Sequence, residues 1–318
     1  MTDSQAAGVP KPAVVHFNNC FNMALEHLHT IAPYAEVATG YANYNYFTSG
    51  STYPAVFQRL RLHGPVPALT LARWFAEENH RPLAAKGKHP GVGATLPLAR
   101  VRKLADTVNA LAKALTKALR DDRATNFPLI QGSIADALQF DTQGDFHLDV
   151  PDQSTDIGTW AGRLTQRYPA GHAINVASQD VLTVLKGAQV YGDKDAPRMA
   201  PGELWDFSDP RVAVSILLPD PMANGLMDWR APYYMVGKVD PTKPPSLKAQ
   251  VPFLADRPDG TQAPWPEFLD EYHKVNPFPP IRLLRIPPFV FPIFDAKFRP
   301  GSTGNTGDPN PGPVGKLL

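Results

Sequence analysis

The sequence predicts an α/β fold in which a parallel sheet is flanked by helices. Three observations support this prediction: an apolar run with β-branched residues at 13–17, an amphipathic stretch at 23–31, and a second apolar run at 36–41. Strand, helix and strand in this order favour parallel pairing, because a helical crossover returns the chain to the same end of the sheet.

Each N-terminal element follows from a local pattern. Residues 13–17 form a short apolar run, which predicts a buried strand. Residues 23–31 carry apolar side chains at spacings of three and four, which predicts a helix that the following proline ends. Residues 36–41 predict the second strand. The Tyr-, Asn-, Ser- and Gly-rich stretch 42–53 predicts a loop, and 54–60 predicts a further helix that opens with a proline.

The later elements show the same two periodicities. Residues 174–190 predict a helix, and 211–218 predict a buried strand that a proline stops. Residues 98–119 predict a long amphipathic helix, whose basic face we expect to be solvated. Its apolar stripe consists of Leu98, Val101, Leu104, Val108, Leu111, Leu115 and Leu119.

Composition narrows the class of protein. The 318 residues are 43% hydrophobic and 19% charged, which is typical of a globular chain. Thirty-one basic against thirty acidic side chains give a net charge of +1, which disfavours a nucleic-acid partner. No apolar run is long enough to span a membrane. The first residues lack a secretion signal, so the chain as written reads as cytoplasmic; a secreted protein stays open if an N-terminal segment is missing.

Prolines divide the chain. Of 35 prolines, 17 fall from residue 241 onward, where they disfavour helix. We therefore expect a main domain over 1–240, a Pro-rich extension packed on it over 241–300, and a disordered tail over 301–318. Docking of the Pro-rich pieces onto a partner is the alternative for the extension.

Cys20 is the candidate for chemistry. It is the only cysteine, which excludes an internal disulfide and a Cys-rich zinc site. It lies after one predicted strand and before one predicted helix, where ligands bind in α/β sheets. A helix N-terminus there favours the thiolate, which is the nucleophilic form. The alternative is a buried cysteine with a structural role.

Residues around Cys20 resemble the clostripain-like cysteine peptidases (family C11, in the caspase-like clan). Asn18-Asn19-Cys20-Phe21 stands in the nucleophile motif of that family, and residues 34–39 stand at its following strand. Three further stretches resemble family motifs and keep their order: STDIGTW at 154–160, AVSILLP at 213–219 and WPEFL at 265–269.

The resemblance implies a caspase-like parallel sheet and a cysteine endopeptidase acting on peptides or proteins. Cys20 would be the nucleophile, and its backbone N–H would be one donor to the oxyanion. No metal site and no required cofactor are expected. Calcium stays open, because clostripain uses it, although the aspartates between 141 and 156 lack the order of an EF-hand. The implied substrate-binding residues are Asn18, Asn19, Tyr41, Tyr44 and Tyr46, with ordinary loop packing as the alternative for the tyrosines.

Two departures from the family pattern shape the prediction. The family's catalytic His lies in a His-Gly upstream of the cysteine, but only nineteen residues precede Cys20. The first strands of the sheet would then be missing, and the His would come from a missing segment or a separate chain. His16 lies four residues back, about 13 Å along a strand. Asn18 stands where the family has a carboxylate that favours basic substrates, so the resemblance does not carry over a preference for Arg or Lys and leaves the substrate preference open.

Two other functions remain as alternatives. The absent His and the neutral Asn18 fit a non-catalytic binding or scaffold descendant of the same fold. An unrelated proline-rich interaction protein is the third interpretation, and a structure without a parallel sheet behind Cys20 would favour it.

If strands are missing before Val14, the residues 14–17 present an exposed apolar edge and face, and the chain is expected to associate. Light scattering should then show oligomers, and a hydrophobic dye should bind. A stable monomer that binds no dye would contradict the idea of missing strands.

Overall fold

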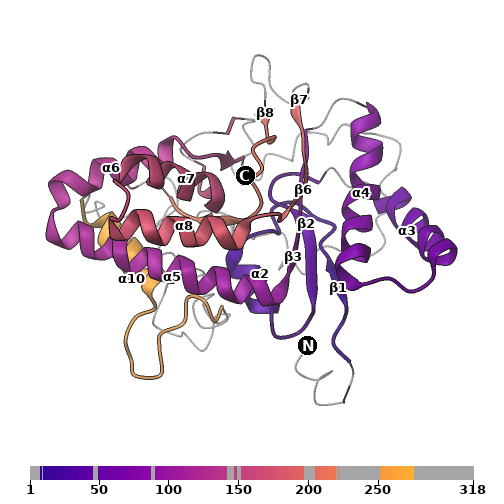
Figure 1. Ribbon diagram of the computed structural model, residues 1–318, viewed down its shortest axis with the longest axis horizontal. Coiled ribbons are helices and arrows are strands. Elements are labelled where there is room, and N and C mark those ends of the chain that lie inside the picture. Colours follow the sequence, from indigo (N-terminus) through magenta and orange to yellow (C-terminus); the bar gives the residue numbers. More distant parts are fainter. Residues whose placement is uncertain are drawn as a thin grey trace, which may run out of the picture.

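The computed structural model describes residues 8, 10–45, 49–86, 90–141, 147–148, 152–196, 205–219, 221 and 251–275. Over these residues, helices flank a four-stranded sheet on both faces (Figure 1). The predicted α/β class is therefore confirmed.

The main sheet has the strand order β1-β2-β3-β6. β1 and β2 are parallel, as predicted, with Val14 opposite Val37. β3 runs antiparallel to both of its neighbours, so the sheet is mixed and not parallel throughout. Two helices lie between β2 and β3, and they return the chain to the edge where β2 ended. The four strands are β1 (Val14–His16), β2 (Val37–Tyr41), β3 (Val92–Pro97) and β6 (Gln189–Gly192).

One edge of this sheet collects several loops. The pairing of Tyr41 with Gly93, and of Val92 with Gly192, places the start of β3 beside the ends of β2 and β6. The carboxyl ends of β1, β2 and β6 therefore lie together, and we call this border the carboxyl edge. Loops that leave it are the usual place for ligand sites in α/β sheets.

Helix α4 (Ala68–Lys86) covers one face of the sheet, and α3 (Ser49–His63) packs against α4 (Figure 1). The predicted loop over 42–53 is wrong in its last part, because α3 begins at Ser49. A contact with α4 stabilises this early start: the Thr52 hydroxyl donates to Asn79 Oδ1 at 3.2 Å.

The opposite face is covered by a larger helical layer built on α5 (Figure 1). The predicted helix over 98–119 is confirmed, and every residue of its apolar stripe is buried. Within the described residues, no helix is long and apolar enough to cross a membrane. The helices of this side are α2 (Leu25–Ile31), α5 (Leu98–Asp121), α6 (Arg123–Ala135), α7 (Ile157–Arg167), α8 (Ala173–Leu185) and α10 (Pro264–Tyr272).

The predicted helix over 174–190 is two elements. α8 ends at Leu185, and the chain enters β6 at Gln189. Gly187 separates them with a φ of 77°, a conformation that glycine adopts without steric cost.

A second, antiparallel sheet has the order β4-β5-β9, and a two-stranded ribbon β7-β8 follows β6. The predicted strand over 211–218 is shorter than expected, because β9 spans only three residues. The bounds are β4 (Gln139–Phe140), β5 (Ser154–Asp156), β7 (Lys194–Ala196), β8 (Trp205–Asp206) and β9 (Ser215–Leu217).

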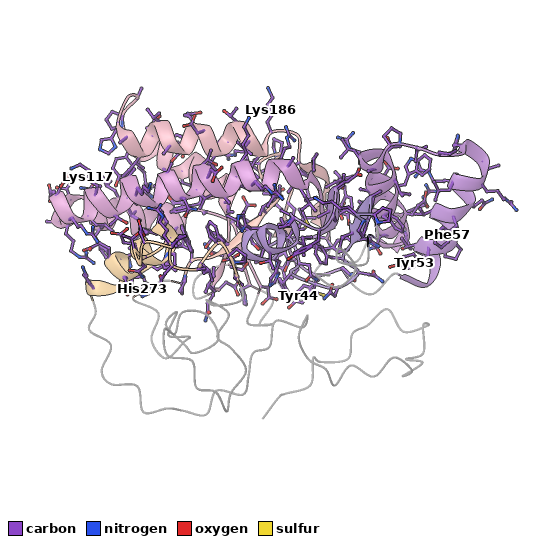
Figure 2. All side chains as sticks on the ribbon, turned by 90° about the horizontal axis from the view of Figure 1, so that it is seen from below. Tyr44, Tyr53, Phe57, Lys117, Lys186 and His273 are labelled. Atoms are coloured by element: carbon purple, nitrogen blue, oxygen red, sulfur yellow. The ribbon has the colours of Figure 1, made fainter. Side chains whose placement is uncertain are left out.

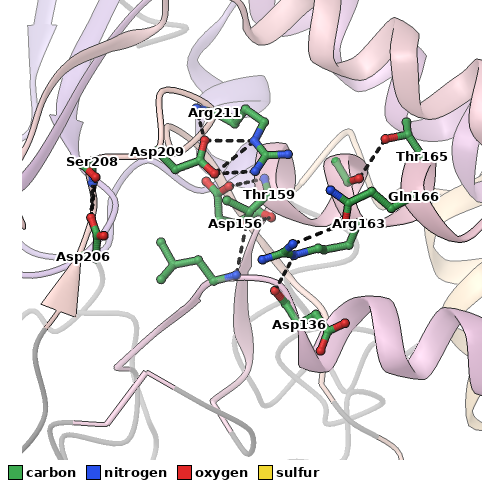
Figure 3. A network of polar contacts seen from close by, with 12 residues as sticks. Asp136, Asp156, Thr159, Arg163, Thr165, Gln166, Asp206, Ser208, Asp209 and Arg211 are labelled. Atoms are coloured by element: carbon green, nitrogen blue, oxygen red, sulfur yellow. Dashed lines mark hydrogen bonds and ion pairs between the residues drawn. The ribbon is translucent and has the colours of Figure 1, made fainter.

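Asp156 explains why the strand starts late. This buried carboxylate caps α7, because its Oδ1 accepts from Thr159 N at 2.6 Å (Figure 3). Its Oδ2 accepts from Ala213 N at 3.0 Å. The N–H of Ala213 is thereby bound to a side chain and not to a neighbouring strand. Burial raises the pKa of Asp156 to about 7, against the lowering effect of its two backbone donors.

Residues 251–275, within the predicted extension, pack on the main domain. Trp265 and Phe268 of α10 are fully buried in the core that α5 lines. Glu271 fastens the end of α10, accepting from Arg120 Nε at 3.0 Å and from Arg123 Nη1 at 3.2 Å. The predicted tail over 301–318 lies outside the described residues.

β1 is the last strand on its side of the main sheet, and no described strand pairs with its outer edge. Its faces are not bare, since residues 14–17 are half-buried. Val14 packs against a small core of Val56, Trp74 and Phe75 from α3 and α4. The expected apolar face is therefore covered in part, and the outer backbone edge is what remains open in the described structure.

Asp156→Asn is expected to destabilise the fold. An amide can accept only through its oxygen, so one of the two buried N–H donors loses its partner, at about 1–3 kcal/mol. Urea unfolding measures this loss. Asp136→Asn is the matched control, because Asp136 is an exposed partner of Arg167 in the same region and should lose less than about 1 kcal/mol. Equal stability of the wild type and the Asp156 variant would contradict the capping role.

Candidate functional site

Cys20 lies at the carboxyl edge of the main sheet, as predicted. It follows β1 by four residues, and its side chain is half-buried. Backbone hydrogen bonds hold its loop against β2 and the residues after it: Phe21 N donates to Asn43 O at 3.1 Å, and Asn22 N donates to Tyr41 O at 3.0 Å. The parallel pair β1–β2 stands behind Cys20, which argues against the unrelated proline-rich protein.

The backbone next to Cys20 is strained. Phe21 has a φ of 55°, and it is the one described non-glycine residue in the left-handed region. For a bulky residue this conformation costs on the order of 1–3 kcal/mol. The Asn22 side chain bridges the turn by donating to Cys20 O at 2.7 Å. Strain of this kind gathers at functional sites, where surrounding contacts hold it in place.

The helix that follows does not reach Cys20. α2 begins at Leu25 and its N-cap is Ala24, so three residues separate the cap from the cysteine. The helix predicted over 23–31 thus starts two residues later than expected, and Cys20 does not lie at its N-terminus. Because a helix dipole acts mainly within its terminal turn, α2 does not supply the thiolate stabilisation expected from the sequence.

The two predicted asparagines lie on either side of a loop contact. Asn18 accepts from Asn45 Nδ2 at 3.2 Å, which joins the loops that follow β1 and β2. Asn19 is half-buried beside Cys20. Asn43 was not predicted. Its side chain is fully buried, and its amide has no hydrogen-bond partner among the described residues. These side chains are all neutral.

The predicted tyrosines do not form one cluster. Tyr41 is the last residue of β2 and is buried, so placing it on a substrate-side loop is wrong. Tyr44 does lie in the loop after β2, in Figure 2 well apart from Tyr53 and Phe57 of α3. Tyr46 lies outside the described residues.

Tyr44 instead joins an aromatic cluster of Phe21, Tyr44 and Trp205. Its ring centroid is 5.1 Å from that of Phe21, edge to face, and 6.1 Å from that of Trp205, stacked. The Tyr44 hydroxyl donates to Asp141 Oδ2 at 3.0 Å. The position of Phe21 beside Cys20 was a signal for its part in the site. Nothing local in the sequence places Trp205 or Asp141 there.

Tyr41 belongs to a row of side chains across the carboxyl edge, on the face that α4 covers. In register, Tyr41 lies opposite Gly93, and Gly93 lies opposite Tyr191. A Cβ at Gly93 would lie 2.2 Å from the Tyr191 ring, so only glycine leaves room for that ring over β3. Beyond Tyr191, the His80 ring stacks on it at 3.8 Å, and His80 Nε2 lies 3.2 Å from Asp193 Oδ1.

Neither of the two histidines packed against this sheet can serve Cys20 as a base. His16 points to the α4 face, where it stacks on Phe75 at 4.8 Å, and burial lowers its pKa to about 4. His80 and Asp193 form a His–carboxylate pair of the kind that bases use. They lie at β6, however, three strand spacings from β1, or about 14 Å.

The acidic residues between 141 and 156 do not form a cation site in the described structure. Asp141 holds Tyr44, Asp156 caps α7, and residues 145 and 149 are outside the described residues. Among the described residues, no group of three or more His, Cys, Asp or Glu side chains is placed to hold a metal ion.

Comparisons with known proteins concern shape alone. No protein-family model matches the sequence. A search of curated proteins also finds no match. Among solved structures, an inactive zymogen C11 protease from Parabacteroides distasonis has a TM-score of 0.48 at 12% identity, over 78% of this chain and 61% of that protein. A clostripain from Bacteroides thetaiotaomicron, solved with a peptide inhibitor, has a TM-score of 0.43 at 12% identity, over 68% and 82%.

A cysteine protease from B. fragilis has a TM-score of 0.43 at 13% identity, over 72% of this chain and 89% of that protein. The chain thus spans less than two thirds of the Parabacteroides protein. With scores below 0.5, these are loose likenesses in fold.

The burial of His16 makes stability depend on pH. Its pKa in the fold, about 4, lies below the ordinary 6.5, so the unfolded chain takes up the proton first as the pH falls. The free energy of unfolding should therefore decrease between about pH 6.5 and pH 4, on the order of 3 kcal/mol from this group. Urea unfolding of the wild type and His16→Phe isolates the effect, because Phe keeps the stack and cannot titrate. An NMR titration midpoint of His16 near 6.5 would contradict it.

Proposed function

We propose that this chain is a clostripain-like cysteine endopeptidase in which Cys20 is the nucleophile. The observation that carries the proposal is the placement of Cys20: half-exposed, at the carboxyl edge of a sheet, beside a strained residue that hydrogen bonds hold in place. The family-like motifs around and after it, kept in order, support the same function.

In the proposed reaction the Cys20 thiolate attacks the carbonyl carbon of the scissile peptide bond. The carbonyl oxygen becomes an oxyanion, to which the Cys20 backbone N–H donates. Collapse of this intermediate breaks the C–N bond, and the base returns its proton to the leaving amine. Water then hydrolyses the thioester, which releases the acid and restores the thiol. No cofactor takes part, and calcium remains an untested alternative.

The general base comes from outside the described residues in this proposal. His16 faces α4, where it stacks on Phe75, and its lowered pKa of about 4 makes it a weak base. His80 lies too far across the sheet. We take as the source a separate chain that adds a strand beside β1, whose outer edge has no described strand partner. A His at the end of such a strand would lie next to Cys20, because neighbouring strands are about 4.8 Å apart.

A non-catalytic binding or scaffold protein of the same fold is the second candidate. It is favoured by the neutral Asn18–Asn45 pair, which cannot act as a base, and by the lowered pKa of His16, about 4, which makes that histidine a weak base. Under this function Cys20 would be replaceable.

A biotinylated peptidyl acyloxymethyl ketone, applied to the cells of origin, is expected to label the wild-type chain at Cys20. The thiolate displaces the carboxylate of the probe and forms a thioether, which mass spectrometry locates. Cys20→Ala is the control. A peptide substrate in excess should slow the labelling.

Labelling no greater than that of Cys20→Ala, together with an unchanged cellular phenotype in Cys20→Ser, would contradict the peptidase and support the binding protein.

A further inference from the structure

We propose that the aromatic cluster of Phe21, Tyr44 and Trp205, with the buried amide of Asn43, forms a subsite for an uncharged apolar or aromatic side chain next to the scissile bond. This inference rests on the proposed function and specifies its substrate class. It departs from a preference for Arg or Lys.

The position of the cluster relative to Cys20 is the first support. Phe21 is the next residue in the chain, and its left-handed backbone sets its ring against Tyr44. Tyr44 in turn stacks on Trp205 of β8, whose side chain is buried. Phe21 and Tyr44 are each only half-buried, so both residues keep some exposed surface in the described structure. Aromatic edges and faces are favourable partners for large apolar side chains.

The electrostatics of the site are the second support. The side-chain hydrogen bond that joins the loops after β1 and β2 is between two neutral amides, Asn18 and Asn45. Asp141, the carboxylate at the cluster, is buried and accepts from the Tyr44 hydroxyl. A guanidinium or ammonium group here would lose water without gaining a bidentate carboxylate partner, which is unfavourable.

Asn43 adds a buried polar side chain whose hydrogen bonds the described residues do not satisfy. Both polar atoms of its side chain are buried and without a partner among the described residues. Its backbone oxygen accepts from Phe21 N, so it lies directly behind the cluster. A buried amide normally has its donor and its acceptor satisfied.

A purely structural role for the rings is the competing explanation, since they also join the Cys20 loop to β8. The two explanations differ in what a substitution does. Loss of a structural contact slows reaction with every substrate alike, whereas loss of a subsite slows reaction only with the substrates that use it.

The test uses a series of acyloxymethyl ketone probes that differ only in the side chain next to the reactive group: Phe, Leu, Arg and Asp. We expect Cys20 of the wild type to react with the Phe and Leu probes at least about tenfold faster than with the Arg probe. Tyr44→Ala should remove most of this difference. Tyr44→Phe, which keeps the ring, should retain it.

A second variant keeps the test decisive if Tyr44→Ala fails to fold, which circular dichroism would show. Asn18→Asp adds a carboxylate and can still accept from Asn45, so it should raise the Arg rate relative to the Phe rate by about tenfold.

The outcomes separate the two proposals. Faster reaction with the Arg probe in the wild type, or an equal loss for all probes in Tyr44→Ala, would overturn the subsite and leave the peptidase standing. No reaction of Cys20 with any probe in the cells of origin would overturn the peptidase and the subsite together.

Discussion

The arrangement of the carboxyl edge depends on Gly93, because glycine has no side chain. Because β3 has no Cβ at this point, the Tyr191 ring can lie over the strand, toward Tyr41. Tyr191 supports His80 of α4, which is held to β6 through Asp193. Tyr41 carries the carbonyl to which Asn22 N donates in the Cys20 loop. One glycine therefore links the cover of the sheet to the geometry of the candidate nucleophile.

Local pattern was sufficient for the elements whose apolar residues form one continuous stripe or run. The long stripe of α5 has a period that only a helix satisfies, and β1 and β2 are short apolar runs with clear ends. β3 escaped prediction because its residues, VGATLP, include glycine and proline and have weak strand propensity; pairing with β2 and β6 makes it a strand. The predicted length of β9 was too great because the Asp156 carboxylate, distant in sequence, accepts the hydrogen bond of Ala213 N.

The candidate site also has a part that the local sequence predicts and a part that it does not. The place of Cys20 could be predicted, because it follows from a strand end only four residues away. The identity of its neighbours could not, because they come from distant segments: Trp205 from β8 and Asp141 from the stretch after β4. The tyrosines show that local composition alone does not predict which side chains come together. Three of them in six residues predicted one cluster, yet the alternation of a strand sends Tyr41 into the core, and Tyr44 lies beyond the strand end in the loop.

At Phe21 the backbone and the side chain favour different residue types. Its backbone conformation would be least strained in a glycine, which adopts a positive φ without a clash. Its ring, however, is the link between the cysteine loop and Tyr44, and a glycine would remove it. Keeping Phe means that the loop cannot relax to an ordinary extended form without breaking an aromatic contact. The contact of the Phe21 ring with Tyr44 therefore holds the strained backbone in place, so that the geometry around the thiol is set before any ligand binds.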